Sequence, residues 1–181
     1  MKLALFAFLL LFNTRESRQQ LSFHPPWQNG KVVKIIDGDT FDVLTNEKKT
    51  IRIRMNGIDC PERKQDFYQS AKNALSGYIF NKEVNLFITG YDRNRRAIAM
   101  VYSNGDNINL VMIRSGLAWH FKKYSTDTSF ANAEQQARLA RKGLWSMDHP
   151  IAPWEFRKKS KRIFTGNNSI SKAPALAYQG F

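Results

Sequence analysis

Carboxylates that could hold a metal ion follow two predicted strand ends. Asp39 comes directly after the turn dipeptide Asp37-Gly38, and Asp59 follows a second strand end further along the chain. Hard cations such as calcium need several oxygen ligands, which carboxylates on adjoining loops supply with little reorganisation. If the two strands are neighbours, the two carboxylates can converge. Each one alone is ordinary turn chemistry, so the candidate metal site depends on the pair.

Two groups of arginines could bind a phosphate beside these carboxylates. Arg54 shortly precedes Asp59 and shares a strand face with Arg52. The second group is Arg93, Arg95 and Arg96. Phosphodiester cleavage adds negative charge to the phosphoryl oxygens, and a guanidinium binds such oxygens through a two-pronged fork that lysine lacks. The pattern indicates phosphoryl chemistry, although the second group by itself is more typical of a solvated turn.

Cysteine and histidine chemistry is largely excluded. Cys60 is the only cysteine, which rules out an intrachain disulfide and any Cys-x-x-Cys motif. We interpret it as a small buried side chain beside a turn, because no basic partner is spaced to make a reactive thiol. His24, His120 and His149 lie too far apart for a zinc-binding motif.

The charge of the chain indicates a polyanionic partner. The 181 residues carry 28 Lys and Arg against 15 Asp and Glu, a net charge of +13. Clustered cations release condensed counterions from nucleic-acid phosphates, although a basic protein can also coat an anionic membrane. With 43% apolar residues, the chain can bury a core without disulfides.

The first residues predict export. Lys2 is followed by an apolar run from Leu3 to Phe12, which is too short to span a bilayer but suits the core of a secretory signal. We therefore expect residues 1–22 to be a signal peptide or, alternatively, a retained N-terminal anchor. The expected location is outside the cell or in the periplasm or cell envelope. Residues 23–29 read as a linker.

The elements that must position these residues predict an α+β fold. Turn dipeptides and alternating apolar residues predict five strands, at residues 30–36, 40–44, 50–55, 83–89 and 97–102. Helical periodicity predicts three α-helices, at 64–80, 108–115 and 128–142. Five short strands with an inserted helix are typical of an OB-type Greek-key β-barrel. We expect Trp119, Trp145 and Trp154 to serve packing, and the basic segment 157–181 to be a disordered tail.

Several ordered motifs resemble the staphylococcal nuclease (thermonuclease) family. They are Asp37-Gly38-Asp39-Thr40, the run RMNGIDCPE at residues 54–62, and Asp92-Arg93-Asn94-Arg95-Arg96 with Ala99 and Tyr102. Asn109, residues 114–119 and residues 143–145 fit the same pattern. The similarity spans residues 30–156, which we take as the nuclease domain.

The resemblance implies calcium-dependent hydrolysis of single- and double-stranded DNA and RNA. The sequence does not fix the oligomeric state, and we take a monomer as the default. By position, it makes Asp39, Asp59 and the backbone carbonyl of Cys60 the calcium ligands. The catalytic residues it implies are Arg54, Glu62 and Arg96. The two arginines would hold the phosphate, and Glu62 would activate or orient the attacking water. The family cleaves the P–O5′ bond and leaves 3′-phosphates.

The chain departs from the family pattern at two places. Asn94 and Arg95 stand where an aromatic residue and a glycine are common, and we favour Arg96 over Arg95 as the phosphate ligand. Lys122 and Tyr124 stand where a nucleotide-packing tyrosine pair is expected. Arg95, Lys122 and Tyr124 are therefore candidate nucleic-acid contacts. A non-catalytic nucleic-acid-binding module and a basic envelope-binding protein are the alternatives.

Overall fold

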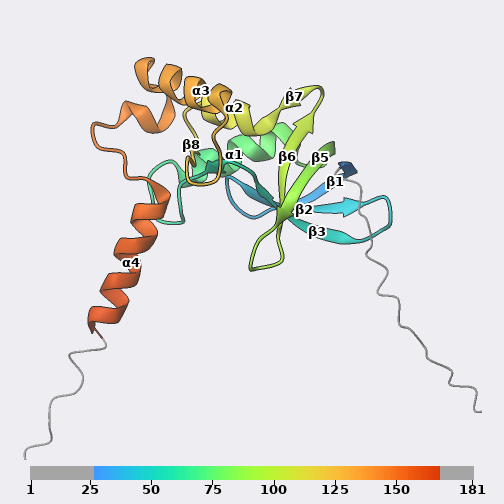
Figure 1. Ribbon diagram of the computed structural model, residues 1–181, viewed down its shortest axis with the longest axis horizontal. Coiled ribbons are helices and arrows are strands. Elements are labelled where there is room, and N and C mark those ends of the chain that lie inside the picture. The colour runs from blue at the N-terminus through green and yellow to red at the C-terminus, as the bar shows by residue number, and fades with distance from the viewer. Residues whose placement is uncertain (1–26, 168–181) are drawn as a thin grey trace, which may run out of the picture.

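The chain folds around a closed β-barrel. The computed structural model describes residues 27–167, with side chains described through residue 160. The barrel strands are β1 (Trp27–Ile35), β2 (Thr40–Thr45), β3 (Thr50–Met55), β5 (Glu83–Tyr91) and β6 (Ala97–Ser103). They follow the order β3-β2-β1-β5-β6, and a parallel pairing of β3 with β6 closes the barrel. The prediction of an α+β fold with a five-stranded OB-type barrel is confirmed (Figure 1).

Local sequence explains how the strands turn and bend. The Asp37 side chain accepts a hydrogen bond from the backbone N–H of Asp39 at 3.1 Å, a turn that starts β2. Register shifts within β1 and β5 bend these two longest strands around the barrel. Along β6, buried residues alternate with partly exposed ones, as expected for a strand with one face toward the core.

A polar side chain secures the barrel closure from inside. Asn109 is fully buried, and its amide donates to the backbone carbonyl of Asn56 at 2.8 Å. Its carbonyl accepts from the N–H of Val101 at 3.0 Å. The end of β3 and the middle of β6 are therefore joined by one side chain whose polar atoms are satisfied.

A second, two-stranded sheet adjoins the barrel. Its strands are β4 (Ile58–Asp59) and β8 (Trp119–His120), and Asp59 pairs with Trp119. The strand β7 (Asp106–Asn107) extends the edge of the barrel beside β6. The small sheet connects the loop after β3 to the helical end of the molecule.

Helices cover one end of the barrel. They are α1 (Tyr68–Ile79), α2 (Ile108–Arg114), α3 (Thr128–Leu139) and the short 3-10 helix η1 (Gly143–Ser146). The three predicted α-helices all form, each shorter than expected. Asn107 and Asp127 cap α2 and α3 by accepting backbone N–H groups. The main core lies between these helices and the barrel strands.

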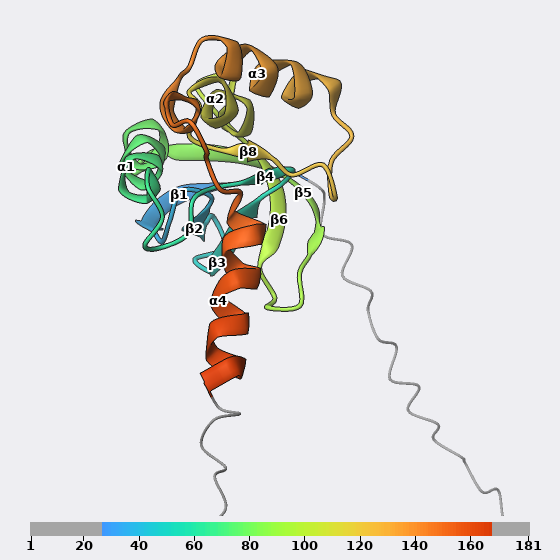
Figure 2. The ribbon, with the colours of Figure 1, turned by 90° about the vertical axis from the view of Figure 1, so that its left-hand side faces the viewer.

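A separate cluster of aromatic residues supports a fourth helix. Trp119 and Trp145 are buried against each other, with ring centroids 4.5 Å apart. Trp154, in the first turn of α4 (Pro153–Asn167), packs edge-on against Trp119. These tryptophans serve packing, as predicted. In both views α4 leaves the helical end of the molecule and points away from α2 and α3 (Figure 1, Figure 2).

Two predicted boundaries are wrong. β1 begins at Trp27, inside the predicted linker, because residues 27–29 pair with β5. Residues 157–167 belong to α4, although the sequence predicts a disordered tail from residue 157; the helix is held by contacts with distant residues, which local composition does not reveal. The predicted signal or anchor at 1–22, the first part of the linker and residues 168–181 lie outside the described residues. Among residues 27–167, no helix is long and apolar enough to cross a bilayer.

Candidate active site

The pairing of β2 with β3 places Asp39 beside Arg54. Thr40 is the register partner of Arg54, and the N–H of Met55 donates to the carbonyl of Asp39 at 2.9 Å. Asp39 is therefore fixed at the mouth of this strand pair. Its carboxylate Oδ2 lies 3.1 Å from Nη1 of Arg54.

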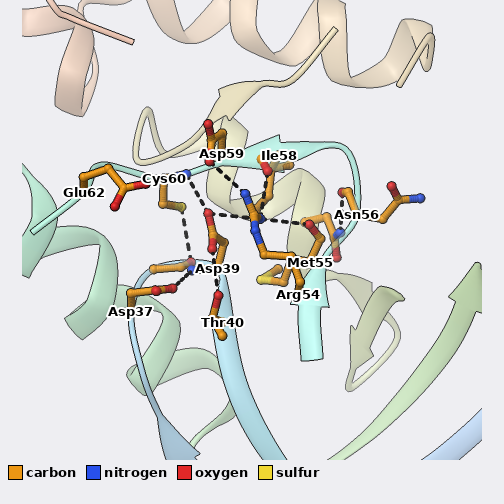
Figure 3. A network of polar contacts seen from close by, with 12 residues as sticks. Asp37, Asp39, Thr40, Arg54, Met55, Asn56, Ile58, Asp59, Cys60 and Glu62 are labelled. Atoms are coloured by element: carbon orange, nitrogen blue, oxygen red, sulfur yellow. Dashed lines mark hydrogen bonds and ion pairs between the residues drawn. The ribbon is translucent and has the colours of Figure 1, made fainter. Parts of the chain in front are cut away.

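The turn after β3 brings Asp59 to the same guanidinium. Gly57 reverses the chain with a φ of +71°, and β4 returns past the end of β3. Nη2 of Arg54 then lies 2.8 Å from Oδ1 of Asp59, and Nη1 also donates to the carbonyl of Ile58 at 2.9 Å. The arginine side chain is only 15% exposed. Figure 3 shows Arg54 between the two carboxylates that the sequence predicted to converge.

Cys60 participates through its backbone, not through a reactive thiol. Its N–H donates to Oδ2 of Asp39 at 2.8 Å, and its Sγ lies 3.2 Å from the carbonyl oxygen of Gly38. Burial raises the pKa of the Cys60 thiol well above its ordinary value. The thiol stays protonated at neutral pH, which agrees with its interpretation as a structural side chain.

The carboxylates raise one another's affinity for protons. Burial and then the charge of Asp39 raise the pKa of Asp37 to about 6. Burial raises the pKa of Asp59 as well, against the lowering effect of Arg157. For Arg54, burial opposes the charge, but Asp39 and Asp59 outweigh it and the pKa rises. This site therefore favours added positive charge.

Barrel closure brings Arg96 toward this group. Because β3 pairs with β6, the start of β6 lies next to Arg54. Nε of Arg96 donates to Asp92 at 2.7 Å, and its Nη1 lies 3.5 Å from Oγ1 of Thr40, the residue after Asp39. Arg95 instead occupies the preceding turn with a φ of +60° and is exposed. The geometry thus separates the two neighbouring arginines.

Arg157 is the site residue that sequence reasoning missed. From α4 it contacts both oxygens of Asp59, with Nη2 at 2.8 Å from Oδ2 and Nη1 at 3.3 Å from Oδ1. Its Nη1 also donates to Oε1 of Glu62. These carboxylates raise the pKa of Arg157 despite its burial. The only sequence signal was the basic run after Trp154, which is equally typical of a solvated tail.

Two of the predicted nucleic-acid contacts lie in the segment after β8. Lys122 is 3.8 Å from Glu134 and is otherwise solvated, with its side chain 72% exposed. Tyr124 is exposed and packs edge-on against Phe121. Lys122 thus contacts α3, and Tyr124 contacts Phe121 in its own segment. Neither contact involves Asp39, Arg54 or Asp59.

The donor chemistry fits a hard divalent cation. The side chains described through residue 160 contain no preassembled group of three or more His, Cys, Asp or Glu around one point. Guanidinium groups lie on the carboxylates Asp39 and Asp59. Among these contacts, Oδ1 of Asp39 accepts one hydrogen bond, from Thr40, and Oδ2 of Asp59 accepts one, from Arg157. Carboxylate oxygens of this kind are ligands that calcium and magnesium prefer.

Comparison with known proteins assigns the family. A sequence model described as staphylococcal nuclease homologue matches residues 52–147. A protein of Haemophilus influenzae called an uncharacterized endonuclease is 42% identical over 131 residues, which cover 72% of this chain and 74% of that protein. A micrococcal nuclease of Shigella flexneri is 39% identical over 150 residues, covering 76% and 86%. A probable staphylococcal-like nuclease of rice is 36% identical over 128 residues, covering 71% and 33%. Together with the barrel and its arginine-linked carboxylates, these matches show that the chain belongs to the staphylococcal nuclease family.

Proposed function

We propose that this protein is a calcium-dependent nuclease that hydrolyses phosphodiester bonds in DNA and RNA. The observation that carries the proposal is the placement of Arg54, which links Asp39 and Asp59 across two strand ends. A buried arginine between two carboxylates provides adjacent sites for a cation and for an anionic phosphate. The names of the relatives, endonuclease and micrococcal nuclease, support the same activity.

The site residues divide into a cation set and a phosphate set. Asp39, Asp59 and the carbonyl oxygen of Cys60 are the proposed calcium ligands. Bound calcium supplies positive charge that neutralises the phosphoryl oxygens as they gain negative charge. Arg54 and Arg96 donate hydrogen bonds to the same oxygens, and such charge stabilisation is usually the largest catalytic effect.

Glu62 handles the attacking water in this proposal. Its side chain is 37% exposed, so a water molecule can reach it. The carboxylate accepts a proton from the water, or orients it, while the water oxygen forms a bond to phosphorus. The P–O5′ bond breaks, the departing O5′ takes a proton from solvent, and the products carry a 3′-phosphate and a 5′-hydroxyl.

The proposed substrates are single- and double-stranded DNA and RNA, bound by a monomer. A net charge of +13 favours any polyanionic strand over a particular sequence. The exposed residues Arg95, Lys122 and Tyr124 are proposed to contact the strand outside the scissile phosphate. We also propose export through the apolar N-terminal run, which would place the enzyme outside the cytoplasm.

One assay tests the proposed function. Purified protein is incubated with single-stranded DNA and with RNA, in calcium or in a calcium chelator, and the product ends are analysed. Cleavage of both polymers in calcium only, with 3′-phosphate ends, is expected, and Asp39→Asn should show little cleavage. Binding without metal-dependent cleavage would make the chain a nucleic-acid-binding module instead.

A further inference from the structure

The helix α4 reaches into the proposed cation site. Its residue Arg157 places both terminal nitrogens on carboxylates of that site, Nη2 on Asp59 and Nη1 on Asp59 and Glu62. These contacts join residues far apart in the sequence. The matched family region ends at residue 147, before α4 begins at Pro153.

The contacts of Arg157 occupy atoms that a cation needs. Oδ1 of Asp59 accepts hydrogen bonds from Arg54 and Arg157, which together use its two lone-pair directions. Oδ2 accepts from Arg157 at 2.8 Å. A calcium ion bonds carboxylate oxygens at about 2.3–2.6 Å, so an ion held by both oxygens of Asp59 takes up a direction at Oδ1 that a guanidinium now fills.

The charge of Arg157 also opposes the binding of a cation at this site. A guanidinium on a ligand oxygen stands only a few ångströms from any ion held by that oxygen, and like charges at this separation repel strongly in a partly buried site. Arg54 makes the same kind of contact, but its side chain is 15% exposed and also donates to backbone carbonyls. The side chain of Arg157 is 39% exposed, so it is the arginine that can move into water.

Other contacts, among the residues whose side chains are described, hold the start of α4. Trp154 stacks on Phe121 with ring centroids 5.0 Å apart, and the side chain of Gln65 donates to the carbonyl of Ile151 just before the helix. Gln65 also accepts from the N–H of Glu62. The start of α4 and the loop that carries Glu62 are therefore linked. Within the part of α4 whose side chains are described, Arg157 is the residue that contacts the site carboxylates.

We propose that Arg157 is a displaceable counter-ion of the cation site, so that α4 restrains the enzyme until calcium binds. Without the cation, Arg157 neutralises Asp59, a proposed calcium ligand, and holds Glu62, the residue proposed to activate or orient water. Both residues are then blocked. Calcium expels the guanidinium and loosens α4. Because linkage is reciprocal, whatever tightens α4 on the site weakens calcium binding by the same factor. This inference rests on the proposed function for its cation site.

The test compares calcium affinity in matched variants. Arg157→Gln removes the charge and the fork, whereas Lys159→Gln makes the same change of charge at an exposed position on the same helix. Calorimetric titration of each purified full-length protein with calcium chloride gives the dissociation constants. Arg157→Gln should bind calcium about tenfold more tightly than wild type, the size expected for removing a half-exposed like charge near the ion. Lys159→Gln should stay within about twofold.

A second measurement follows α4 directly. Amide hydrogen exchange of a peptide covering residues 153–160 should become faster in the wild type when calcium is added, because the helix loses its contact with Asp59. The same peptide in Arg157→Gln should already exchange faster without calcium. Both results are required.

The outcomes separate this inference from the proposed function. Equal or weaker calcium binding by Arg157→Gln overturns the inference, and so does exchange that calcium leaves unchanged or slows. After either result, the proposed function still stands if the wild type binds calcium and cleaves DNA. Absence of calcium binding in all three proteins overturns the inference together with the metal in the proposed function.

Discussion

Nη2 of Arg54 and Oδ1 of Asp59 lie 2.8 Å apart in a site where both side chains are almost fully buried. A buried charge deprived of its partner is costly, so this pair must stabilise the fold as well as serve the chemistry. The carbonyl oxygens of Met55 and Ile58 accept further hydrogen bonds from the same guanidinium, and Asp39 forms an ion pair with it. Arg54 therefore connects the strand end, the turn after it and the start of β2.

Replacing Arg54 by alanine should damage both activity and stability. We expect cleavage of single-stranded DNA to fall by about 10³-fold or more, since a main phosphate donor is lost. The free energy of unfolding should fall by about 3–5 kcal/mol, because two buried carboxylates lose their counter-ion. Initial cleavage rates and urea denaturation followed by tryptophan fluorescence measure the two effects.

Arg96→Ala is the matched control for that variant. Its side chain is 28% exposed and its ion pair with Asp92 is partly solvated, so the stability loss should stay within about 1 kcal/mol. The loss of activity should resemble that of Arg54→Ala. Near-normal cleavage by Arg96→Ala would remove Arg96 from the mechanism.

Glu62→Gln should lower the cleavage rate by about 10²-fold, the usual contribution of a positioned base. Glutamine keeps an oxygen that can accept the hydrogen bond from Arg157, so the contact with α4 is retained. Initial rates on single-stranded DNA in calcium measure the loss. A drop of only a fewfold would leave orientation of water as the role of Glu62.

Cys60→Ser should keep calcium dependence and a cleavage rate within about threefold of wild type. A serine hydroxyl can make the hydrogen bond to Gly38 that the thiol makes now, and the backbone carbonyl of residue 60 is unchanged. Alkylation with iodoacetamide should leave the native wild type active, because the thiol is buried and protonated. Rapid inactivation by the reagent would contradict this assignment.

Asp37→Asn should stabilise the calcium-free protein at neutral pH. The folded state holds a proton on Asp37 up to a pKa of about 6, whereas the unfolded chain loses it near 3.8. The folded state therefore binds more protons between pH 4 and 6, and wild-type stability falls as the pH rises through that window. Above pH 6 the loss of wild-type stability caused by ionising Asp37 is complete. Asparagine does not ionise and so avoids this loss. We expect a gain of about 1–2 kcal/mol at pH 7.5 and none at pH 3.5.

Urea denaturation at pH 3.5, 5 and 7.5 measures this difference. Asp66→Asn makes the same change of charge at an exposed position and serves as the control. It should change stability by no more than about 0.5 kcal/mol at each pH. Equal pH profiles for wild type and Asp37→Asn would show that Asp37 is ionised in the folded state without cost.

The sequence predicts those parts of the site that depend on local patterns. The Asp37-Gly38 turn and the glycine reversal at residue 57 mark strand ends, and strand pairing then brings Asp39 and Asp59 together. The alternation of apolar and charged residues along β3 does not show whether Arg54 faces solvent or the interior, because each strand has two faces. Its burial is decided by the return of β4 across the end of β3.

The contact of Arg157 with Asp59 could not be predicted in this way. It joins residues 98 apart in sequence, and the helix that carries Arg157 is rich in lysine and arginine, as solvated tails are. The start of β1 was missed for a related reason. Trp27 gains strand geometry by pairing with Phe87, a partner on a distant strand.

The parallel closure of β3 against β6 also has a kinetic consequence. Ile53 pairs with Ala97, so the chain between them must fold and return before the barrel can close. Arg54 and Arg96 are on opposite sides of that closure, and until it forms they are independent side chains on separate segments. A chain that has not yet closed the barrel therefore contains the residues of the site but not its geometry. Any activity of this site must wait until the barrel has closed.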